Sequence, residues 1–312
     1  MTSEPAVATY RRLAASGELD RRAAEAAALL TACVLCGNRC GADRSAAPAG
    51  LCRTGPRARV HGWGPHHGEE APLSGWRGSG TVFFSWCNLA CVFCQNAELS
   101  RLGAGDELSP EELASAFLDL EERGCHNVNL VSPSHVVAPV LAALALAARK
   151  GLSLPLVWNS GGYDSLEALA LLDGVVDVYM PDLKYGDAAT AERLSGVPAY
   201  PRVSQAAVRE MHRQVGDLVL DESGIAVRGL LVRHLVLPGG LAGTESVLSF
   251  LADEVSRDTY LNLMGQYRPA FQARDHPPLD RAVTPAELSE AYALAARHGL
   301  RRLDGPWRGR RT

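Results

Sequence analysis

Six short apolar runs appear along the chain after residue 80, and longer segments of mixed polarity separate them. The runs cover residues 81–86, 128–132, 154–160, 175–183, 229–238 and 260–267. Each run is nearly continuous in apolar side chains, which is typical of strands buried on both faces of a parallel sheet. The pattern therefore predicts six strands of one buried parallel sheet.

The segments between these runs carry the signals of amphipathic helices. Residues 109–112 and 284–287 each place Ser or Thr three positions before Glu, with Pro at the first helical position, which indicates a capping box. Residues 137–148 have apolar side chains at helical spacing. Alternating strands and helices predict an α/β fold, namely a partial parallel (β/α)6-type TIM-like barrel, with a doubly wound sheet as the alternative. In both folds, ligands bind at the carboxyl ends of the strands.

The first 80 residues do not share this alternation. Residues 1–32 resemble a helix in their spacing of Leu among Ala, Arg and Glu, and residues 33–80 are rich in Gly, Pro, His and Cys. We therefore expect two parts. Residues 1–80 form a helical lead-in and a cysteine-rich, metal-binding extension, and residues 81–312 form the barrel.

Composition narrows the class of protein. Apolar residues make up 47% and charged residues 21% of the 312 positions, as in a globular protein with a large core. The net charge of −4 argues against binding to nucleic acid or to an anionic membrane. Neither a transmembrane segment nor a signal peptide is evident, so we expect a cytoplasmic protein. In that compartment the eight cysteines favour metal or cluster ligation over disulfides.

Three cysteines follow the first predicted strand directly. Cys87, Cys91 and Cys94 lie within eight residues, in the loop that should leave the ligand-binding end of the barrel. Thiolates bind a [4Fe-4S] cluster one per iron, so three ligands leave one iron open to a cofactor or substrate. The alternative is a zinc site that Cys125 or a histidine completes.

The string FFSWCNLACVFCQN at residues 83–96 resembles the radical S-adenosylmethionine (SAM) superfamily, and within it the pyruvate formate-lyase activating enzyme-like branch. The resemblance extends from Cys33 to about Gly299. It implies that the open iron binds the amino and carboxylate groups of SAM. One electron from the reduced cluster then cleaves the sulfonium C–S bond, and the 5′-deoxyadenosyl radical abstracts a hydrogen atom from substrate. We assign no catalytic residue beyond the cluster and SAM.

The same resemblance implies a glycine of a glycyl radical enzyme as the substrate, and a reductant such as flavodoxin or ferredoxin. Modification of a peptide or small molecule by the same chemistry is the alternative reaction. The non-enzymatic alternatives are an iron–sulfur electron carrier and a zinc-containing interaction module. A pure carrier, however, needs neither a large barrel nor the charged pair described next.

Polar residues after the later strands are candidates for binding SAM. They are Ser132, Ser134, Asn159, Asp182, Lys184 and Arg233. The two serines replace a glycine-rich segment of the superfamily and can accept hydrogen bonds from an amino group. Asp182 and Lys184 resemble the Asp-x-Lys segment of activating enzymes, and their spacing puts both on one face of a strand. A plain turn or a salt-bridged strand end is the structural alternative. For the fifth strand, we expect Arg233 to point into the barrel in preference to His234.

A second cysteine set precedes the barrel. Cys33, Cys36, Cys40 and Cys52 form a four-thiol group that is typical of a structural zinc site or a second iron–sulfur cluster. Free or redox-active thiols are the third interpretation. His135, which begins the segment after the second strand, can bind substrate, transfer a proton or face solvent.

Overall fold

The computed structural model describes residues 8–304 of the chain, and its centre is a sheet in which six neighbouring strands run parallel. In spatial order these strands are β2 (Ser79–Phe84), β4 (Val128–Val131), β5 (Leu156–Ser160), β6 (Val178–Pro181), β8 (Ala226–Leu235) and β9 (Tyr260–Met264). Each strand overlaps one of the six apolar runs. Because their spatial order follows the chain without a reversal, the sheet winds in one direction as a barrel does. The predicted partial (β/α)6 barrel is confirmed.

Four shorter or antiparallel strands extend this sheet. They are β1 (Ala58–His66), β3 (Asp106–Leu108), β7 (Val219–Leu220) and β10 (Leu303–Asp304). β1 pairs antiparallel with both β2 and β3, and β10 pairs parallel with β9. Within residues 8–304 the two outer strands, β3 and β10, do not pair with each other, so the barrel is open along one side. The segment before residue 80 thus contributes a strand next to the first barrel strand.

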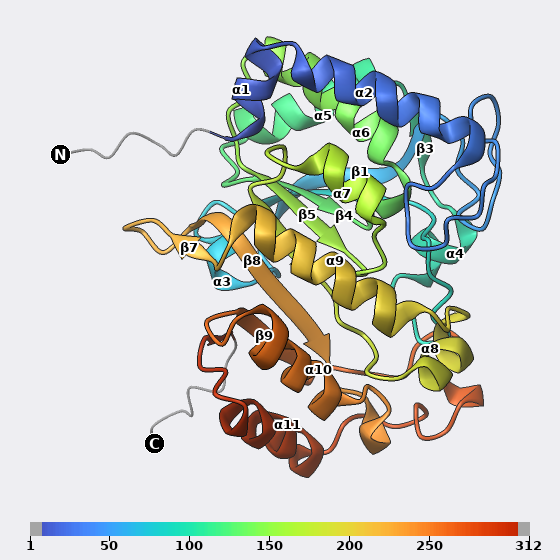
Figure 1. Ribbon diagram of the computed structural model, residues 1–312, viewed down its shortest axis with the longest axis vertical. Coiled ribbons are helices and arrows are strands. Elements are labelled where there is room, and N and C mark those ends of the chain that lie inside the picture. The colour runs from blue at the N-terminus through green and yellow to red at the C-terminus, as the bar shows by residue number, and fades with distance from the viewer. Residues whose placement is uncertain (1–7, 305–312) are drawn as a thin grey trace.

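Helices alternate with most of the strands along the chain. They are α1 (Tyr10–Ala15), α2 (Glu18–Ala28), α3 (Ala71–Ser74), α4 (Ala97–Leu102), α5 (Pro110–Glu122), α6 (Val137–Arg149), α7 (Leu166–Leu172), α8 (Ala188–Ser195), α9 (Tyr200–Val215), α10 (Thr244–Phe250) and α11 (Pro285–Arg297). Single turns add η1 (Leu29–Ala32), η2 (Pro133–His135), η3 (Pro238–Gly240), η4 (Leu251–Val255) and η5 (Ala273–Asp275). The lead-in helices α1 and α2 lie at the opposite end of the molecule from α11 (Figure 1), and α2 packs on α6. In the part of the chain described, no helix is long and apolar enough to cross a membrane.

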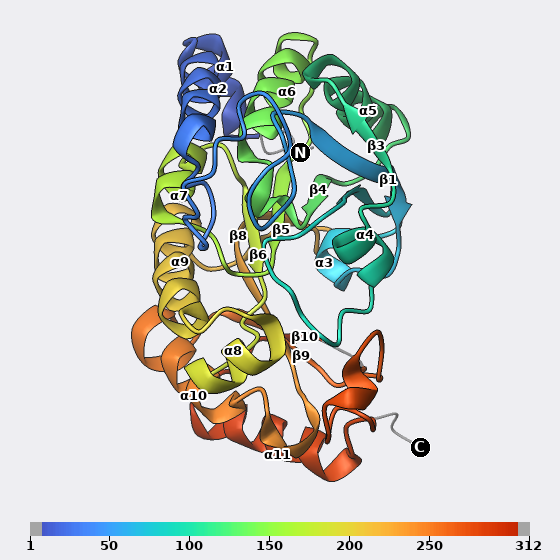
Figure 2. The same cartoon turned by 90° about the vertical axis from the view of Figure 1, so that its right-hand side faces the viewer.

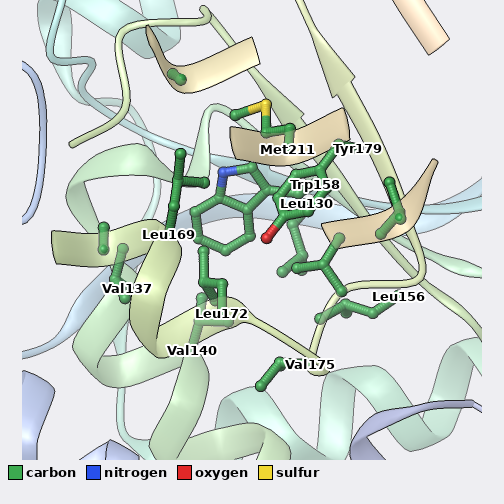
Figure 3. Close-up of a cluster of buried hydrophobic side chains, with 14 of the residues drawn as sticks. Leu130, Val137, Val140, Leu156, Trp158, Leu169, Leu172, Val175, Tyr179 and Met211 are labelled. Atoms are coloured by element: carbon green, nitrogen blue, oxygen red, sulfur yellow. The ribbon is translucent and has the colours of Figure 1, made fainter. Parts of the chain in front are cut away.

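The main core lies between the sheet and the helices on its outer side (Figure 2). Trp158 of β5 is fully buried there among Leu130, Leu169 and other apolar side chains, as Figure 3 shows. Its indole Nε1 donates to the carboxylate of Asp164 at 3.1 Å, so the one polar atom of the ring has a partner. Neighbouring residues in β5 face the opposite way, and Asn159 therefore points to the inside of the barrel.

Both predicted capping boxes are present, and the one on α5 gives a first testable expectation. The Ser109 hydroxyl accepts from the Glu112 N–H at 3.2 Å, and the Glu112 carboxylate accepts from the Ser109 N–H at 2.7 Å. Ser109→Ala should lower the free energy of unfolding by about 1 kcal/mol, because an N–H of the first turn loses its partner. Urea denaturation measures the change. Ser115→Ala, at an exposed site on the same helix, is the control and should change it by less than about 0.5 kcal/mol.

Candidate functional site

A cavity of about 540 Å³ lies at the carboxyl ends of the parallel strands, within the size range of about 300–1,000 Å³ that is usual for ligand sites. The predicted site residues that line it are Cys87, Cys91, Cys94, Ser132, Asn159, Asp182, Lys184 and Arg233. Ser134 does not line it but is buried close to Asp164. A larger cavity of about 630 Å³ between α10 and α11 contains none of the predicted residues. The candidate chemistry is therefore concentrated in the first cavity.

The loop that carries the three cysteines is held by its apolar residues. Leu89 and Phe93 are buried in a small apolar cluster formed by α8, α9 and the chain after β9. The Phe93 ring meets Tyr185 and Tyr267 edge-on, with centroids 6.4 and 6.0 Å away. These two side chains anchor the loop, whose three cysteines line the cavity.

Each thiol has a polar neighbour. Ser195 Oγ donates to Cys91 Sγ at 2.9 Å, the Leu89 N–H donates to Cys87 Sγ at 3.4 Å, and Ser100 Oγ lies 3.1 Å from Cys94 Sγ. Burial raises the pKa of Cys87 to about 12, and it also raises the pKa of Cys91, which the charge of Lys184 opposes. Without a bound metal, Cys87 and Cys91 are therefore neutral at pH 7, and a metal must displace their protons. Sequence reasoning missed Ser100 and Ser195.

Asp182 and Lys184 lie together on the cavity wall just after β6. Lys184 Nζ donates to Asp182 Oδ2 at 2.5 Å, and about a fifth of each side chain is exposed. Burial lowers the pKa of Lys184, but the charge of the Asp182 carboxylate and its hydrogen bond outweigh this effect, so the ammonium stays charged. The Tyr200 hydroxyl accepts from the Lys184 N–H at 3.0 Å and donates to the Gly161 carbonyl at 2.8 Å. The predicted pair thus exists as an ion pair, and Tyr200 connects it to the end of β5.

The ends of β4 and β5 meet at Ser132 and Asn159. The Ser132 N–H donates to the Asn159 carbonyl at 2.8 Å, and Ser132 has φ 59° and ψ 49°, a left-handed conformation that is uncommon for a residue other than glycine. Gly162 follows with φ 72°, and a Cβ there would lie 2.1 Å from the Asp182 carbonyl oxygen. Only glycine allows this approach of the β5 loop to the end of β6.

Arg233 faces the cavity, as predicted, whereas the buried His234 contacts the Leu183 carbonyl and Thr244 outside it. The Arg233 guanidinium is already paired: Nε and Nη2 donate to the two carboxylate oxygens of Glu70 at 2.7 and 2.6 Å, and Nη2 also reaches Glu69. A buried cation in a strand required such a partner. The sequence carried no signal that Glu69 and Glu70, more than 160 residues earlier, would supply it.

His135 is buried below the cysteine loop, in contact with neither solvent nor the cavity. Its Nε2 lies 3.0 Å from the Ser85 carbonyl, which can only accept, so Nε2 carries the proton. Burial lowers the pKa of His135 to about 4, and the ring is neutral at pH 7. His135 therefore supports the first residue of the cysteine loop. Both the solvent-facing interpretation and the one in which His135 binds substrate or transfers a proton are wrong.

Comparisons with known proteins identify the family of the chain. Residues 81–221 match the model of the radical SAM superfamily. The chain is 31% identical over 292 residues to the uncharacterized protein MJ0674 of Methanocaldococcus jannaschii. The aligned region covers 90% of this chain and 79% of that protein.

Among solved structures, a radical SAM methyltransferase from Sphaerobacter thermophilus has 16% identity and a TM-score of 0.47. That similarity covers 71% of this chain and 64% of the methyltransferase chain. Streptococcus suis SuiB bound to the precursor peptide SuiA has 11% identity and a TM-score of 0.46, over 68% of this chain and 44% of SuiB. This chain thus spans less than two thirds of either.

The superfamily match begins at β2 and includes the cysteine loop, Ser132, Asn159, Asp182 and Lys184. The relative from Methanocaldococcus extends the similarity over most of the remaining chain. Membership implies a [4Fe-4S] cluster and SAM as cofactors. This chain belongs to the radical SAM superfamily.

Proposed function

We propose that this radical SAM enzyme holds its [4Fe-4S] cluster on Cys87, Cys91 and Cys94 and binds SAM in the cavity of about 540 Å³ beside them. The observation that carries the proposal is the meeting of three thiols, an Asp–Lys ion pair and polar strand ends in one cavity. When bound, the cluster and SAM supply one-electron cleavage of the sulfonium C–S bond and a carbon radical that abstracts hydrogen from substrate.

The residues around the thiols fit a cluster. Thiolates bound to metal carry negative charge, which hydrogen-bond donors and nearby cations stabilise. The Leu89 N–H and the Ser195 hydroxyl donate to two of the sulfurs, and the Lys184 ammonium is close enough to favour the Cys91 thiolate. Phe83, Leu89 and Phe93 also line the cavity and reduce the access of water.

Asp182 and Lys184 would exchange their mutual ion pair for contacts with SAM. The ammonium of Lys184 suits a carboxylate or ribose oxygens, and the carboxylate of Asp182 suits an amine. Ser132 and Asn159 present hydroxyl and amide groups from the two neighbouring strand ends. These four side chains would orient SAM, and none of them needs to transfer a proton.

We propose that the substrate is a peptide or small molecule that enters at the end of the cavity lined by His66, Glu69 and Gln266. Glu69 and Glu70 together carry one more negative charge than Arg233 neutralises, so this end favours a substrate with a cationic group. Substrate would therefore approach from the side of β1 and β9, where these residues lie.

A glycine of a glycyl radical enzyme is the second candidate substrate. The open side of the barrel between β3 and β10 favours it, because a loop of another protein needs such an opening, and the string at residues 83–96 resembles activating enzymes. In both cases a flavodoxin or ferredoxin would supply the electron.

The experiment is anaerobic purification, reduction with dithionite and measurement of 5′-deoxyadenosine after addition of SAM. The candidates are then compared as deuterated substrates: a pool of peptides and small molecules, and a glycyl radical enzyme labelled at glycine. Deuterium in 5′-deoxyadenosine identifies the hydrogen donor, and a glycyl radical signal in electron paramagnetic resonance would favour the second candidate. A protein with a fully loaded cluster that forms no 5′-deoxyadenosine under any of these conditions overturns the proposal.

Lys184→Gln should weaken SAM binding by about 10- to 100-fold, because a charge-assisted hydrogen bond of about 1.5–3 kcal/mol is lost. Equilibrium dialysis with labelled SAM, in the cluster-loaded protein, measures the change. The only other lysine of the chain, Lys150, is exposed at the end of α6, and Lys150→Gln is the matched control. Equal SAM affinity in the two variants would remove Lys184 from the proposed site.

A further inference from the structure

The four cysteines before the barrel lie in one loop, residues 33–52, which we call the knot. The Cys33 N–H donates to the Ala42 carbonyl and the Gly41 N–H to the Cys33 carbonyl, both at 3.0 Å, so the loop closes on itself. Cys36 interacts electrostatically with both Cys33 and Cys52, and these three side chains are buried. Cys40 is exposed, but its Sγ lies next to Gly50, where a Cβ would be 3.1 Å from it. Residues 33–52 thus bring three of the thiols near one another and hold Cys40 at the surface of the same loop.

A fully buried arginine lies against these thiols. Arg44 has 0% of its surface exposed, and its guanidinium donates to the Thr54 carbonyl at 2.7 Å, the His135 carbonyl at 2.6 Å and Cys33 Sγ at 3.2 Å. Within residues 8–304 no carboxylate forms an ion pair with it. A guanidinium is always charged, and a buried charge is rarely tolerated without a counter-charge. Among its hydrogen-bond partners within residues 8–304, the Cys33 thiol is the one that can become anionic.

We propose that Cys33, Cys36, Cys40 and Cys52 bind a metal centre as thiolates and that Arg44 balances its negative charge. Four thiolates exceed the charge of a divalent zinc ion or of a [4Fe-4S] core by two. One adjacent guanidinium reduces this excess and donates a hydrogen bond to a coordinating sulfur, as groups around metal ligands commonly do. This site is separate from the cavity that holds Cys87, Cys91 and Cys94.

The knot also contacts the loop that carries the other cysteines. Asn38 Nδ2 donates to the Asn88 carbonyl at 2.6 Å, and Asn88 Nδ2 donates to the Tyr163 carbonyl at 2.7 Å. The same Tyr163 carbonyl accepts from the Gly37 N–H at 2.8 Å, and a Cβ at Gly37 would lie 2.7 Å from the Tyr163 ring. A centre bound by Cys36 therefore fixes the residues that position Asn88, which is adjacent to Cys87.

Arg44 makes a second connection to that loop. Its Nη2 donates to the His135 carbonyl, and the His135 ring donates to the Ser85 carbonyl at the start of the cysteine loop. Arg44 is thus a positioning residue for both sites. The knot has to draw its thiols together on binding, because among residues 8–304 no three side chains of His, Cys, Asp or Glu are arranged to hold a single ion.

The test uses the full chain with Cys87, Cys91 and Cys94 all replaced by alanine, so that it does not depend on SAM chemistry. After anaerobic expression with iron and zinc, one metal centre per chain is expected. One zinc ion per chain, or four irons with matching sulfide and a cluster absorption band, would each support the proposal and identify the metal. A folded protein, by circular dichroism, that holds less than about a tenth of a centre per chain would overturn it.

Substitutions of Arg44 in the same background test the counter-charge. Arg44→Met should weaken metal retention against a chelator by about 10- to 100-fold. Arg44→Lys should retain the metal better than Arg44→Met, because lysine keeps the positive charge although its shape differs from that of arginine. Cys125→Ser is the matched control, because Cys125 is a buried thiol outside both sets. Equal retention in Arg44→Met and the parent would show that Arg44 does not balance a metal centre. Cys40→Ser, at an exposed site, provides a ligand variant with little risk to folding.

Discussion

Cys91→Ala is expected to reduce formation of 5′-deoxyadenosine from SAM to background. Cys91 is the central cysteine of the triplet; its Sγ accepts a hydrogen bond from the Ser195 hydroxyl, and the Lys184 ammonium acts on it electrostatically. Each thiolate holds one iron, so two remaining ligands cannot keep the cluster with a single open iron. The iron content of the variant should also fall by the amount in about one cluster per chain, because each cysteine thiolate binds one iron of the cluster.

Three measurements check this expectation in the same samples: iron and sulfide content, the electron paramagnetic resonance signal after reduction, and 5′-deoxyadenosine by chromatography. Cys125→Ser is the control, because its thiol is also buried but does not line the cavity. It should leave all three values unchanged. Persistent SAM cleavage by Cys91→Ala would mean that the cluster is held elsewhere, and the second cysteine set would then be the first place to examine.

The barrel was predictable because its signals are local. A strand buried on both faces needs a continuous apolar run, and a helix start needs its cap within three residues. The strands β2, β4, β5, β6, β8 and β9 and the boxes at Ser109 and Thr284 are therefore visible in short windows. The same holds for Cys87, Cys91 and Cys94, and for Asp182 with Lys184, which are close in sequence. Their common location in one cavity follows from parallel strands whose carboxyl ends share one edge.

The parts of the site that were not predictable depend on contacts between distant residues. Ser195 lies 104 positions after Cys91, and Glu70 lies 163 positions before Arg233. Neither residue belongs to a local pattern. Ser134 shows the opposite case. It was predicted to bind SAM because it follows the cavity residue Ser132 closely in sequence, but the turn η2 directs its side chain towards Asp164. A backbone turn decides this direction, and sequence spacing alone does not.

The Arg233–Glu70 pair shows how the segment before the barrel and the barrel depend on each other. Glu70 precedes α3, in the segment that enters the sheet through β1, and Arg233 lies in β8, several strands away. Asn262 of β9 donates to the same carboxylate at 2.7 Å. This polar cluster therefore connects the segment after β1 to β8 and β9, and it forms one wall of a second cavity of about 500 Å³.

Glu70→Ala should lower the free energy of unfolding by about 3–5 kcal/mol, because it leaves a buried guanidinium with only part of its counter-charge. Only 1% of the Glu70 side chain and 15% of the Arg233 side chain are exposed. Guanidinium chloride denaturation under anaerobic conditions measures the change. Glu254→Ala is the matched control, because it breaks an exposed ion pair with Arg209. The Arg209 side chain is 43% exposed and the Glu254 side chain 53%, so the free energy of unfolding should fall by less than about 1 kcal/mol.

The same pair predicts how acid affects the protein. Burial raises the pKa of Glu70, but the hydrogen bonds and charge of Arg233 outweigh it, so the pKa in the folded state lies below its ordinary value. The stabilisation by Glu70 is then fully present above the unfolded pKa of about 4.3 and is lost as the pH falls through the folded value. The stability difference between the parent and Glu70→Ala should therefore be constant from pH 6 to 8, as these lie well above about 4.3, and should shrink below about pH 4. A difference that does not change down to pH 3 would mean that the carboxylate charge of Glu70 does not stabilise the fold.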